Sequence, residues 1–156
     1  MKVFEKLVFP NGSYVPNRIA KAAMEENMAD LNHASSEELM RLYQAWANGG
    51  VGLIITGNVM VDRQAMTGPG GVVLEDEKHL DTFKKWAQLG RSKGAQVWLQ
   101  INHPGRQMQA NLGQQTWAPS AISLDLGKMS NRFNTPIEMT ESMIAEVIQR
   151  FANTAR

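Results

Sequence analysis

The amino-acid sequence predicts an α/β fold, namely the first three βα units of a TIM (β/α)8 barrel preceded by a short N-terminal β-hairpin. The segment Val51–Val61 is apolar on both faces, as buried parallel strands are. Strand-like and helix-like segments alternate along the chain, which favours parallel strands joined by right-handed crossovers. A closed barrel of this kind needs about 250 residues. The 156 residues are therefore expected to form one domain, a partial barrel over 1–156 that is truncated relative to a whole one.

The N-terminal residues predict the hairpin and the first strand. Phe9–Pro16 contains Asn11-Gly12, a dipeptide typical of a tight hairpin turn. Ile19–Met24 is a run of small and apolar residues and is expected to be the first parallel strand. A polar loop then leads to the first helix.

Capping signals predict where two helices begin and end. Ser35 and Glu38 have the spacing of a capping box, and Gly49-Gly50 should end the helix that follows. The acidic residues 75–77 suit the N-terminus of a second helix, which should end near Lys93-Gly94. Both helices carry apolar residues at intervals of three and four, which is typical of a face packed on a sheet.

The C-terminal part predicts a third strand, a long loop and a third helix. Ala95–Ile101 is the expected strand, and Thr140 is the expected cap of the last helix. The loop Asn102–Pro136 is too long for a simple connection, so we expect it to serve a function.

Composition excludes several classes of site. The formal net charge is +1 and the basic residues are dispersed, so we expect no nucleic-acid partner. The absence of cysteine excludes disulfides, cysteine-bound metals and a thiol nucleophile, and we expect no metal site. No apolar run approaches 18 residues and no leader is recognisable, so we expect a cytoplasmic protein with no membrane partner. Asp62 and Arg63 are expected to be solvated loop charges.

The segment Trp98–Arg106 contains the strongest functional signal. A mostly apolar strand reaches Gln100 and passes at once into a His-Pro-Gly-Arg turn. In a (β/α) barrel the C-terminal ends of the strands hold ligands. The Gln100 amide can match the donor and acceptor edge of an imide-like ring such as a flavin or a pyrimidine. The residues alone leave a second interpretation open, in which Gln100 and His103 only hold the loop in place.

The sequence resembles the N-terminal part of the Old Yellow Enzyme family, whose members are FMN-dependent oxidoreductases on a TIM barrel. Matching motifs follow one another in the family's order over nearly the whole chain. They are Pro10-Asn11-Gly12, Pro16–Ile19, Ala22–Met24, Gly49–Gly57, Leu99–Arg106, Ala118–Ile122 and Glu138–Thr140.

The resemblance implies which residues contact the flavin. Ala23, Met24 and Glu25 should line the flavin ring, and Gly57 should lie close to it where a side chain would collide. Gln100 should bond to the pyrimidine edge of the flavin. Glu25 departs from the family, because relatives often carry Thr or Cys there. An ionised carboxylate at that position would disfavour a reduced anionic flavin.

The resemblance also implies a substrate pocket formed by Asn102, His103 and Arg106. His103 and Arg106 belong to the family's His-x-Gly-Arg turn. Many relatives carry an aromatic residue where this chain has Asn102, so the pocket should be more polar here.

By resemblance, the expected function is the transfer of hydride from NAD(P)H through FMN to an activated alkene, a small-molecule substrate. The family's catalytic residues lie on later strands, so the resemblance assigns no catalytic residue to this chain. The alternative is an inactive partial barrel that associates with itself or with a complementary barrel segment through its open sheet edges. A tRNA-modifying flavin barrel is disfavoured by the dispersed charge.

Overall fold

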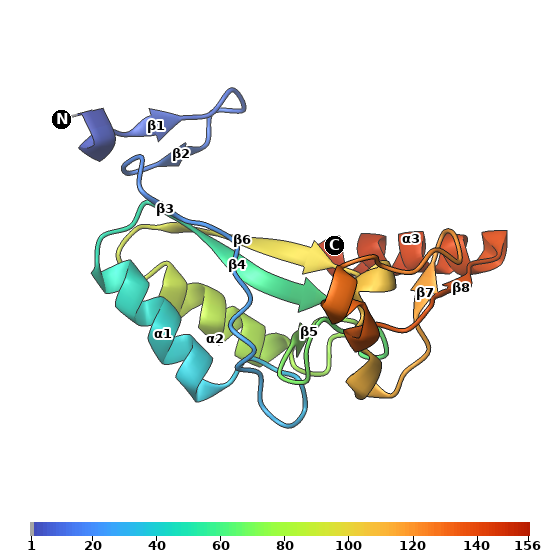
Figure 1. Ribbon diagram of the computed structural model, residues 1–156. Coiled ribbons are helices and arrows are strands. Elements are labelled where there is room, and N and C mark those ends of the chain that lie inside the picture. Colours follow the sequence, from blue (N-terminus) through green and yellow to red (C-terminus); the bar gives the residue numbers. More distant parts are fainter. Residues whose placement is uncertain (1) are drawn as a thin grey trace.

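The computed structural model describes residues 2–156, and its N-terminal part forms a hairpin that stands apart from the main sheet (Figure 1). A 3-10 helix, η1 (Lys2–Phe4), precedes the antiparallel strands β1 (Leu7–Val8) and β2 (Tyr14–Val15). The predicted Asn-Gly turn lies between them, and Gly12 has a φ of 83°. A left-handed conformation of this kind favours glycine, which explains the residue at the turn.

The main sheet is parallel and carries two helices on one face (Figure 1). The central strand β4 pairs with β3 on one side and with β6 on the other, and the short β5 pairs with its C-terminal end. The bounds are β3 (Ala20–Lys21), α1 (Glu37–Asn48), β4 (Leu53–Met60), β5 (Val72–Val73), α2 (Leu80–Gly90) and β6 (Gln96–Asn102). No helix within residues 2–156 covers the opposite face, which we call the inner face.

The core lies between the sheet and the two helices. Tyr43 of α1 stacks edge-on against Trp86 of α2, with 4.8 Å between ring centroids. Ile54 and Val59 of β4 are fully buried against them. The apolar spacing of both helices is thereby confirmed as the pattern of a buried face. The remaining buried members of this cluster are Leu39, Met40, Ala47, Val72, Phe83 and Ala95.

Several predicted boundaries are wrong by a few residues. The cap of α1 is Ser36, whose hydroxyl accepts a hydrogen bond from the N–H of Leu39 at 3.0 Å, whereas Ser35 is buried beside it. α2 begins at Leu80, after the acidic residues 75–77 that were expected at its N-terminus, and it ends at Gly90, before Lys93-Gly94. The first parallel strand is shorter than Ile19–Met24, because residues 22–27 leave the sheet and pass over β4.

A β-bulge divides β4 into two halves. Ile55 pairs with Trp98, yet Asn58 pairs with Gln100, so β4 contains one more residue than β6 between these pairs. Side chains alternate between the two faces of a strand, and one extra residue reverses that alternation. Ile54 before the bulge and Val59 after it therefore both face the helices. The bulge turns Asn58 to the inner face beside Gln100.

The long loop after β6 contains short ordered elements (Figure 1). Two 3-10 helices, η2 (Gly105–Gln107) and η3 (Ala110–Leu112), come first. β7 (Trp117–Ala118) then pairs in parallel with β8 (Ile137–Glu138), across the 3-10 helix η4 (Gly127–Arg132). α3 (Glu141–Ala155) contacts β6, and its predicted cap Thr140 accepts from the N–H of Met143 at 3.3 Å.

Candidate functional site

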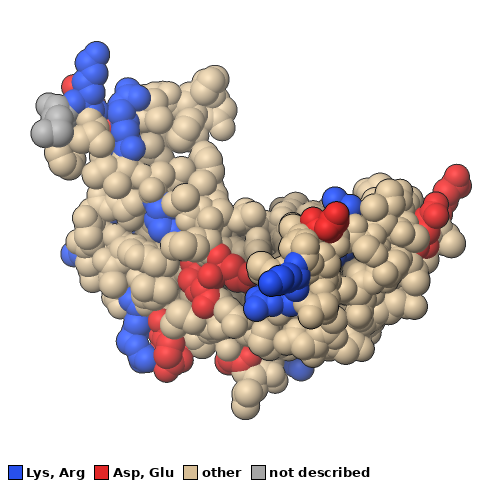
Figure 2. Space-filling view, viewed as in Figure 1, with Lys and Arg blue, Asp and Glu red and all other residues tan. Residues whose placement is uncertain are grey.

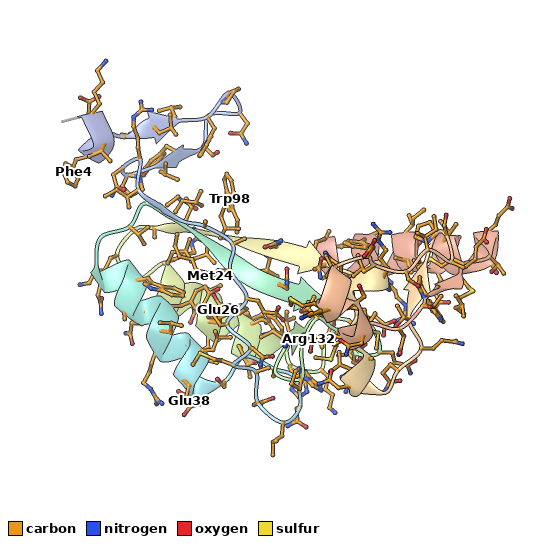
Figure 3. All side chains as sticks on the ribbon, viewed as in Figure 1. Phe4, Met24, Glu26, Glu38, Trp98 and Arg132 are labelled. Carbon is orange, nitrogen blue, oxygen red and sulfur yellow. The ribbon has the colours of Figure 1, made fainter. Side chains whose placement is uncertain are left out.

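Gly57 lies in the bulge of β4, three residues before that strand ends at Met60. A Cβ atom on Gly57 would overlap the carbonyl oxygen of Met24, the Cα of Glu25 and the carboxylate of Glu26. Residues 22–27 thus lie directly on the backbone of β4 at this point (Figure 3). The absence of a side chain at Gly57 is explained by this backbone crossing within the chain itself.

Residues 22–27, which we call the crossing segment, contain predicted flavin contacts that are open to solvent. Ala23 and Glu25 are exposed, and Met24 is 64% exposed. The carboxylate of Glu25 accepts a hydrogen bond from the hydroxyl of Thr67 in the loop after β4. Gln109 in turn donates to the carbonyl of Thr67 at 2.9 Å. The segment therefore has a fixed place next to the strand ends while its outer surface stays free.

Gln100 and Asn58 form a pair of amides on the inner face. Their Cα atoms are register partners across β4 and β6, so both side chains leave the sheet on the same side. Neither amide makes a hydrogen bond within residues 2–156, and Gln100 is exposed. Asn58 is a candidate that sequence reasoning did not single out, because a strict alternation along β4 would place it on the helix face.

The backbone next to these amides is held by a side chain. The N–H of Gln100 donates to the hydroxyl of Thr56 at 3.0 Å. This bond closes the gap that the bulge opens in the ladder between β4 and β6. The side-chain amide of Gln100 therefore projects from a backbone that is held in place by a hydrogen bond to the neighbouring strand.

His103 lies in a second environment, a small cavity of about 100 Å³ that Asp62 and Trp117 also line. Its Nδ1 accepts a hydrogen bond from the N–H of Gly105 at 3.2 Å, and Nε2 is buried without a partner within residues 2–156. Burial lowers the pKa of His103, although the carboxylate of Asp62 raises it in part and Arg150 adds to the lowering. The imidazole is consequently favoured in its neutral form with the proton on Nε2.

The expectation that Asp62 is solvated is wrong. Asp62 is 5% exposed, forms an ion pair with Arg150 of α3 at 3.3 Å and accepts from the N–H of Gln64 at 2.9 Å. The partner residue lies almost ninety positions further along the chain, so no local pattern could have revealed the pair.

The other two substrate-pocket candidates are separated from each other. Asn102 projects from the end of β6 and its amide contacts the sulfur of Met60 at 3.7 Å. Arg106 is exposed and lines a groove with Pro119, Ser120 and Ile122, a groove that none of the flavin candidates lines. Asn102 is thus next to the paired amides along β6, whereas Arg106 belongs to the surface of the long loop.

Charged side chains of both signs are interspersed over the face seen in Figure 2. Among residues 2–156, no group of three or more His, Asp or Glu side chains is arranged to hold a metal ion. Over the same residues, no helix has the length and apolar character that crossing a membrane requires.

The sequence matches the NADH:flavin oxidoreductase / NADH oxidase family over residues 2–156. The chain belongs to this family. A flavin oxidoreductase from Neonectria sp. (strain DH2), named as NADH-dependent, is 35% identical over 93% of this chain and 21% of its own length. The NADH oxidase of Thermoanaerobacter brockii is 37% identical over 90% of this chain and 21% of its own. The chain spans between 21% and 40% of the length of the first four curated relatives.

Solved structures show that the chain has part of an Old Yellow Enzyme-like α/β fold. A 2-naphthoyl-CoA reductase superposes with a TM-score of 0.89 at 24% identity, over 99% of this chain and 25% of its own. The Old Yellow Enzyme homologue from Zymomonas mobilis superposes with a TM-score of 0.84 at 20% identity, over 99% of this chain and 44% of its own. Family membership supports FMN as the cofactor and a nicotinamide as the hydride donor.

The residues at the strand ends fit a flavin ring. The outer surface of residues 23–25 is exposed, and Gln100 and Asn58 offer unbonded donors and acceptors on the inner face of the neighbouring strands. An isoalloxazine ring presents an imide edge that an amide can match and a flat face that needs close backbone approach. None of these groups would have to break a hydrogen bond within the chain to meet such a ring.

Proposed function

We propose that residues 1–156 supply the flavin-ring site of an FMN-dependent oxidoreductase. In this proposal they act as one domain and form the first three βα units of a (β/α)8 barrel. The observation that carries the proposal is the crossing of residues 22–27 over Gly57, directly beside the unbonded amides of Asn58 and Gln100. Ligands of parallel barrels bind at this end of the strands.

Each residue has a distinct part in binding. Gln100 donates to and accepts from the pyrimidine edge of the ring, and Asn58 contacts the same edge from β4. Ala23, Met24 and Glu25 border the ring through the backbone of the crossing segment. Asn102 and His103 orient the substrate above it, and Arg106 acts at the outer rim of that pocket. These roles agree with the exposure of Gln100 and with the position of Asn102 next to it along β6.

The flavin, when bound, supplies the hydride chemistry between a reduced nicotinamide and a small-molecule substrate. We propose an activated alkene as that substrate and either NADH or NADPH as the donor. A cytoplasmic location, where both nicotinamides are available, belongs to the same proposal. The chain's own residues bind and orient the ring and keep its edge hydrogen-bonded.

Titration with FMN tests the proposal directly. Flavin fluorescence and the visible spectrum of FMN are followed as purified chain is added. Saturable binding with a Kd of about 1–10 µM is expected for the wild type, and Gln100→Ala should raise that Kd about tenfold, the equivalent of one good hydrogen-bonded contact.

A matched control is Gln88→Ala, because Gln88 is an exposed glutamine on α2, on the helix-covered side of the sheet. It should bind FMN as the wild type does. Equal Kd values for Gln100→Ala and the wild type would contradict the assignment of Gln100. Absence of binding up to about 500 µM would refute the proposed site.

A second candidate is an inactive chain that associates through its open edge. β6 is one of the edge strands of the main sheet, and its Trp98 and Leu99 are 45% and 39% exposed. Trp98 contacts only the hairpin ring of Phe9, at 5.5 Å between centroids, among the aromatic residues described (Figure 3). An unpaired edge with apolar side chains favours pairing with another chain.

Sedimentation at several protein concentrations distinguishes the two candidates. If the chain associates through β6, Leu99→Lys should shift it toward the monomer. Leu31→Lys is the control, because Leu31 is fully exposed in the first loop. A wild type that stays monomeric at all concentrations would rule out the second candidate.

A further inference from the structure

The proposed function leaves one buried ionic cluster unused. The ammonium of Lys21 lies 2.6 Å from a carboxylate oxygen of Glu26, and the two side chains are only 9% and 10% exposed. The same ammonium donates to the carbonyl of Ile55 in β4 at 3.1 Å. It also lies 4.7 Å from the ring centroid of Trp46 in α1. Figure 3 shows Glu26 on the crossing segment, where that segment passes over β4.

Tyr43 of α1 extends this cluster to the candidate site. Its hydroxyl donates to Glu26 at 3.0 Å and accepts from the backbone N–H of Gly57 at 3.2 Å. Burial first, and then the charge of Glu26, raises the pKa of Tyr43 far above its ordinary value. The phenol therefore keeps its proton, and the direction of the chain of bonds is settled from Gly57 through Tyr43 to Glu26.

Burial of this cluster opposes folding unless each charge is paired. Removing a carboxylate and an ammonium from water is unfavourable, and apolar side chains of similar size would often give the fold equal or greater stability. What an ion pair offers in addition is a specific geometry. Here the bonds join β3, the crossing segment, the bulge of β4 and helix α1 at one point.

We propose that Lys21, Glu26 and Tyr43 are positioning residues for the flavin ring. They hold residues 22–27 against the bulge of β4 at Gly57. They thereby set where the exposed backbone of Met24 and Glu25 lies relative to Asn58 and Gln100, and the ring would bind against these groups. The inference rests on the proposed function, since it assigns to the cluster a task at that same site. A merely structural cluster would stabilise the fold equally well without affecting how the folded protein holds FMN.

Hydrogen exchange of the backbone amides tests, without any ligand, whether Tyr43 holds residues 22–27 against β4. Tyr43→Phe retains the ring in the core and removes only the hydroxyl. We expect the amides of residues 22–27 and of Gly57 to exchange about tenfold faster in this variant, while those of α2 stay unchanged. Amides that exchange through local opening report that opening, and unchanged exchange in α2 shows that global unfolding is not the cause. Unchanged exchange over these residues would overturn the proposal.

FMN affinity and the spectrum of the bound flavin test the positioning role. The measurements are made on the intact protein, well below the temperature at which any variant unfolds, so that a lower stability alone leaves the Kd unchanged. Tyr43→Phe and Glu26→Gln should each raise the Kd about fivefold to tenfold and shift the visible bands of bound FMN. A lower melting temperature with an unchanged Kd and spectrum would show that the cluster is structural only, and would overturn the proposal.

Tyr14→Phe is the matched control. Tyr14 is 48% exposed in the hairpin, and its ring, which the variant retains, packs under the ammonium of Lys6. It should leave exchange at residues 22–27 and FMN affinity as in the wild type.

The two readouts separate failure of the inference from failure of the proposed function. If the wild type binds no FMN but Tyr43→Phe accelerates exchange, the cluster does hold residues 22–27 against β4. The proposed flavin site is then refuted, and the positioning role for the ring is refuted with it. If the wild type binds FMN and neither variant changes its Kd, the proposed function stands and the positioning role is refuted.

Discussion

The hydroxyl of Thr56 accepts a hydrogen bond from the backbone N–H of Gln100, 3.0 Å away, at the point where the register between β4 and β6 shifts. A side chain thereby completes a ladder that the backbone leaves open. Thr56 is completely buried, so no water can replace its hydroxyl. The orientation of Gln100, the principal flavin candidate, depends on this bond.

Thr56→Val should destabilise the chain by about 1–2 kcal/mol, because the part-buried N–H of Gln100 would lose its acceptor. Thr56→Ser retains the hydroxyl, so its free energy of unfolding should fall clearly less than that of Thr56→Val. Urea unfolding of both variants measures the difference. Equal stability of Thr56→Val and the wild type would show that the bond contributes nothing.

Gly57→Ala should destabilise the chain by about 1–3 kcal/mol through overpacking, because the new methyl group would meet the backbone of residues 24 and 25. Gly113→Ala is the control. Gly113 has open space around it but a φ of 76°, so its substitution should cost about 1 kcal/mol from the backbone conformation alone. Thermal unfolding compares the two. A smaller loss for Gly57→Ala than for Gly113→Ala would contradict the close crossing.

The stability of the chain should fall below about pH 6.5 partly because of His103. Its folded pKa is lowered, chiefly by burial, from an ordinary value of 6.5. As the pH falls, the unfolded state therefore binds the proton first. Protonation then stabilises the unfolded state relative to the folded one, increasingly so from the unfolded pKa down to the folded pKa. Above that window the contribution of neutral His103 is fully present.

His103→Gln tests this pH dependence. The difference in unfolding free energy between the wild type and the variant should change with pH only between neutrality and the folded pKa of His103. Its slope cannot exceed about 1.4 kcal/mol per pH unit for one proton. Parallel pH profiles of the two proteins would show that His103 does not titrate differently in the folded state.

Arg150→Ala should destabilise the chain by about 1–2 kcal/mol, because it leaves the buried carboxylate of Asp62 without its cation and loosens α3 from the loop after β4. Arg41→Ala is the control, since the pair of Arg41 with Glu38 is exposed at 66% and 63% and should contribute little to stability. Denaturant unfolding of both variants decides, and similar losses would contradict a special role for the Asp62 pair.

Glu25→Gln should raise the midpoint potential of bound FMN, since it removes a negative charge from the border of the proposed ring site while retaining an acceptor for Thr67. A shift on the order of 30 mV corresponds to about 1.4 kcal/mol for a two-electron couple. Glu138→Gln, on exposed β8, should leave the potential unchanged. An unaltered potential in Glu25→Gln would place that carboxylate away from the ring.

The positions of the helices and of the long strand could be predicted from the sequence, because their signals are local. Apolar residues at intervals of three and four predict α1 and α2, and a run that is apolar on both faces predicts β4. Thr140 and the Asn-Gly turn lie where their local hydrogen bonding requires. The motif from Gln100 to Arg106 indicates which end of the sheet to inspect.

The composition of the candidate site was decided by tertiary structure. The bulge that turns Asn58 toward Gln100 exists only because β4 pairs with β6, and a strand considered alone carries no record of its register. Asp62 pairs with Arg150, and Glu26 pairs with Lys21 and accepts a hydrogen bond from Tyr43. The contact with Arg150 and the bond from Tyr43 depend on how distant elements pack. The sequence by itself determined the order and kind of the elements through local periodicity and capping. Only the packed structure determined which polar groups are paired and which stay free, because pairing depends on neighbours that the chain brings together after it folds.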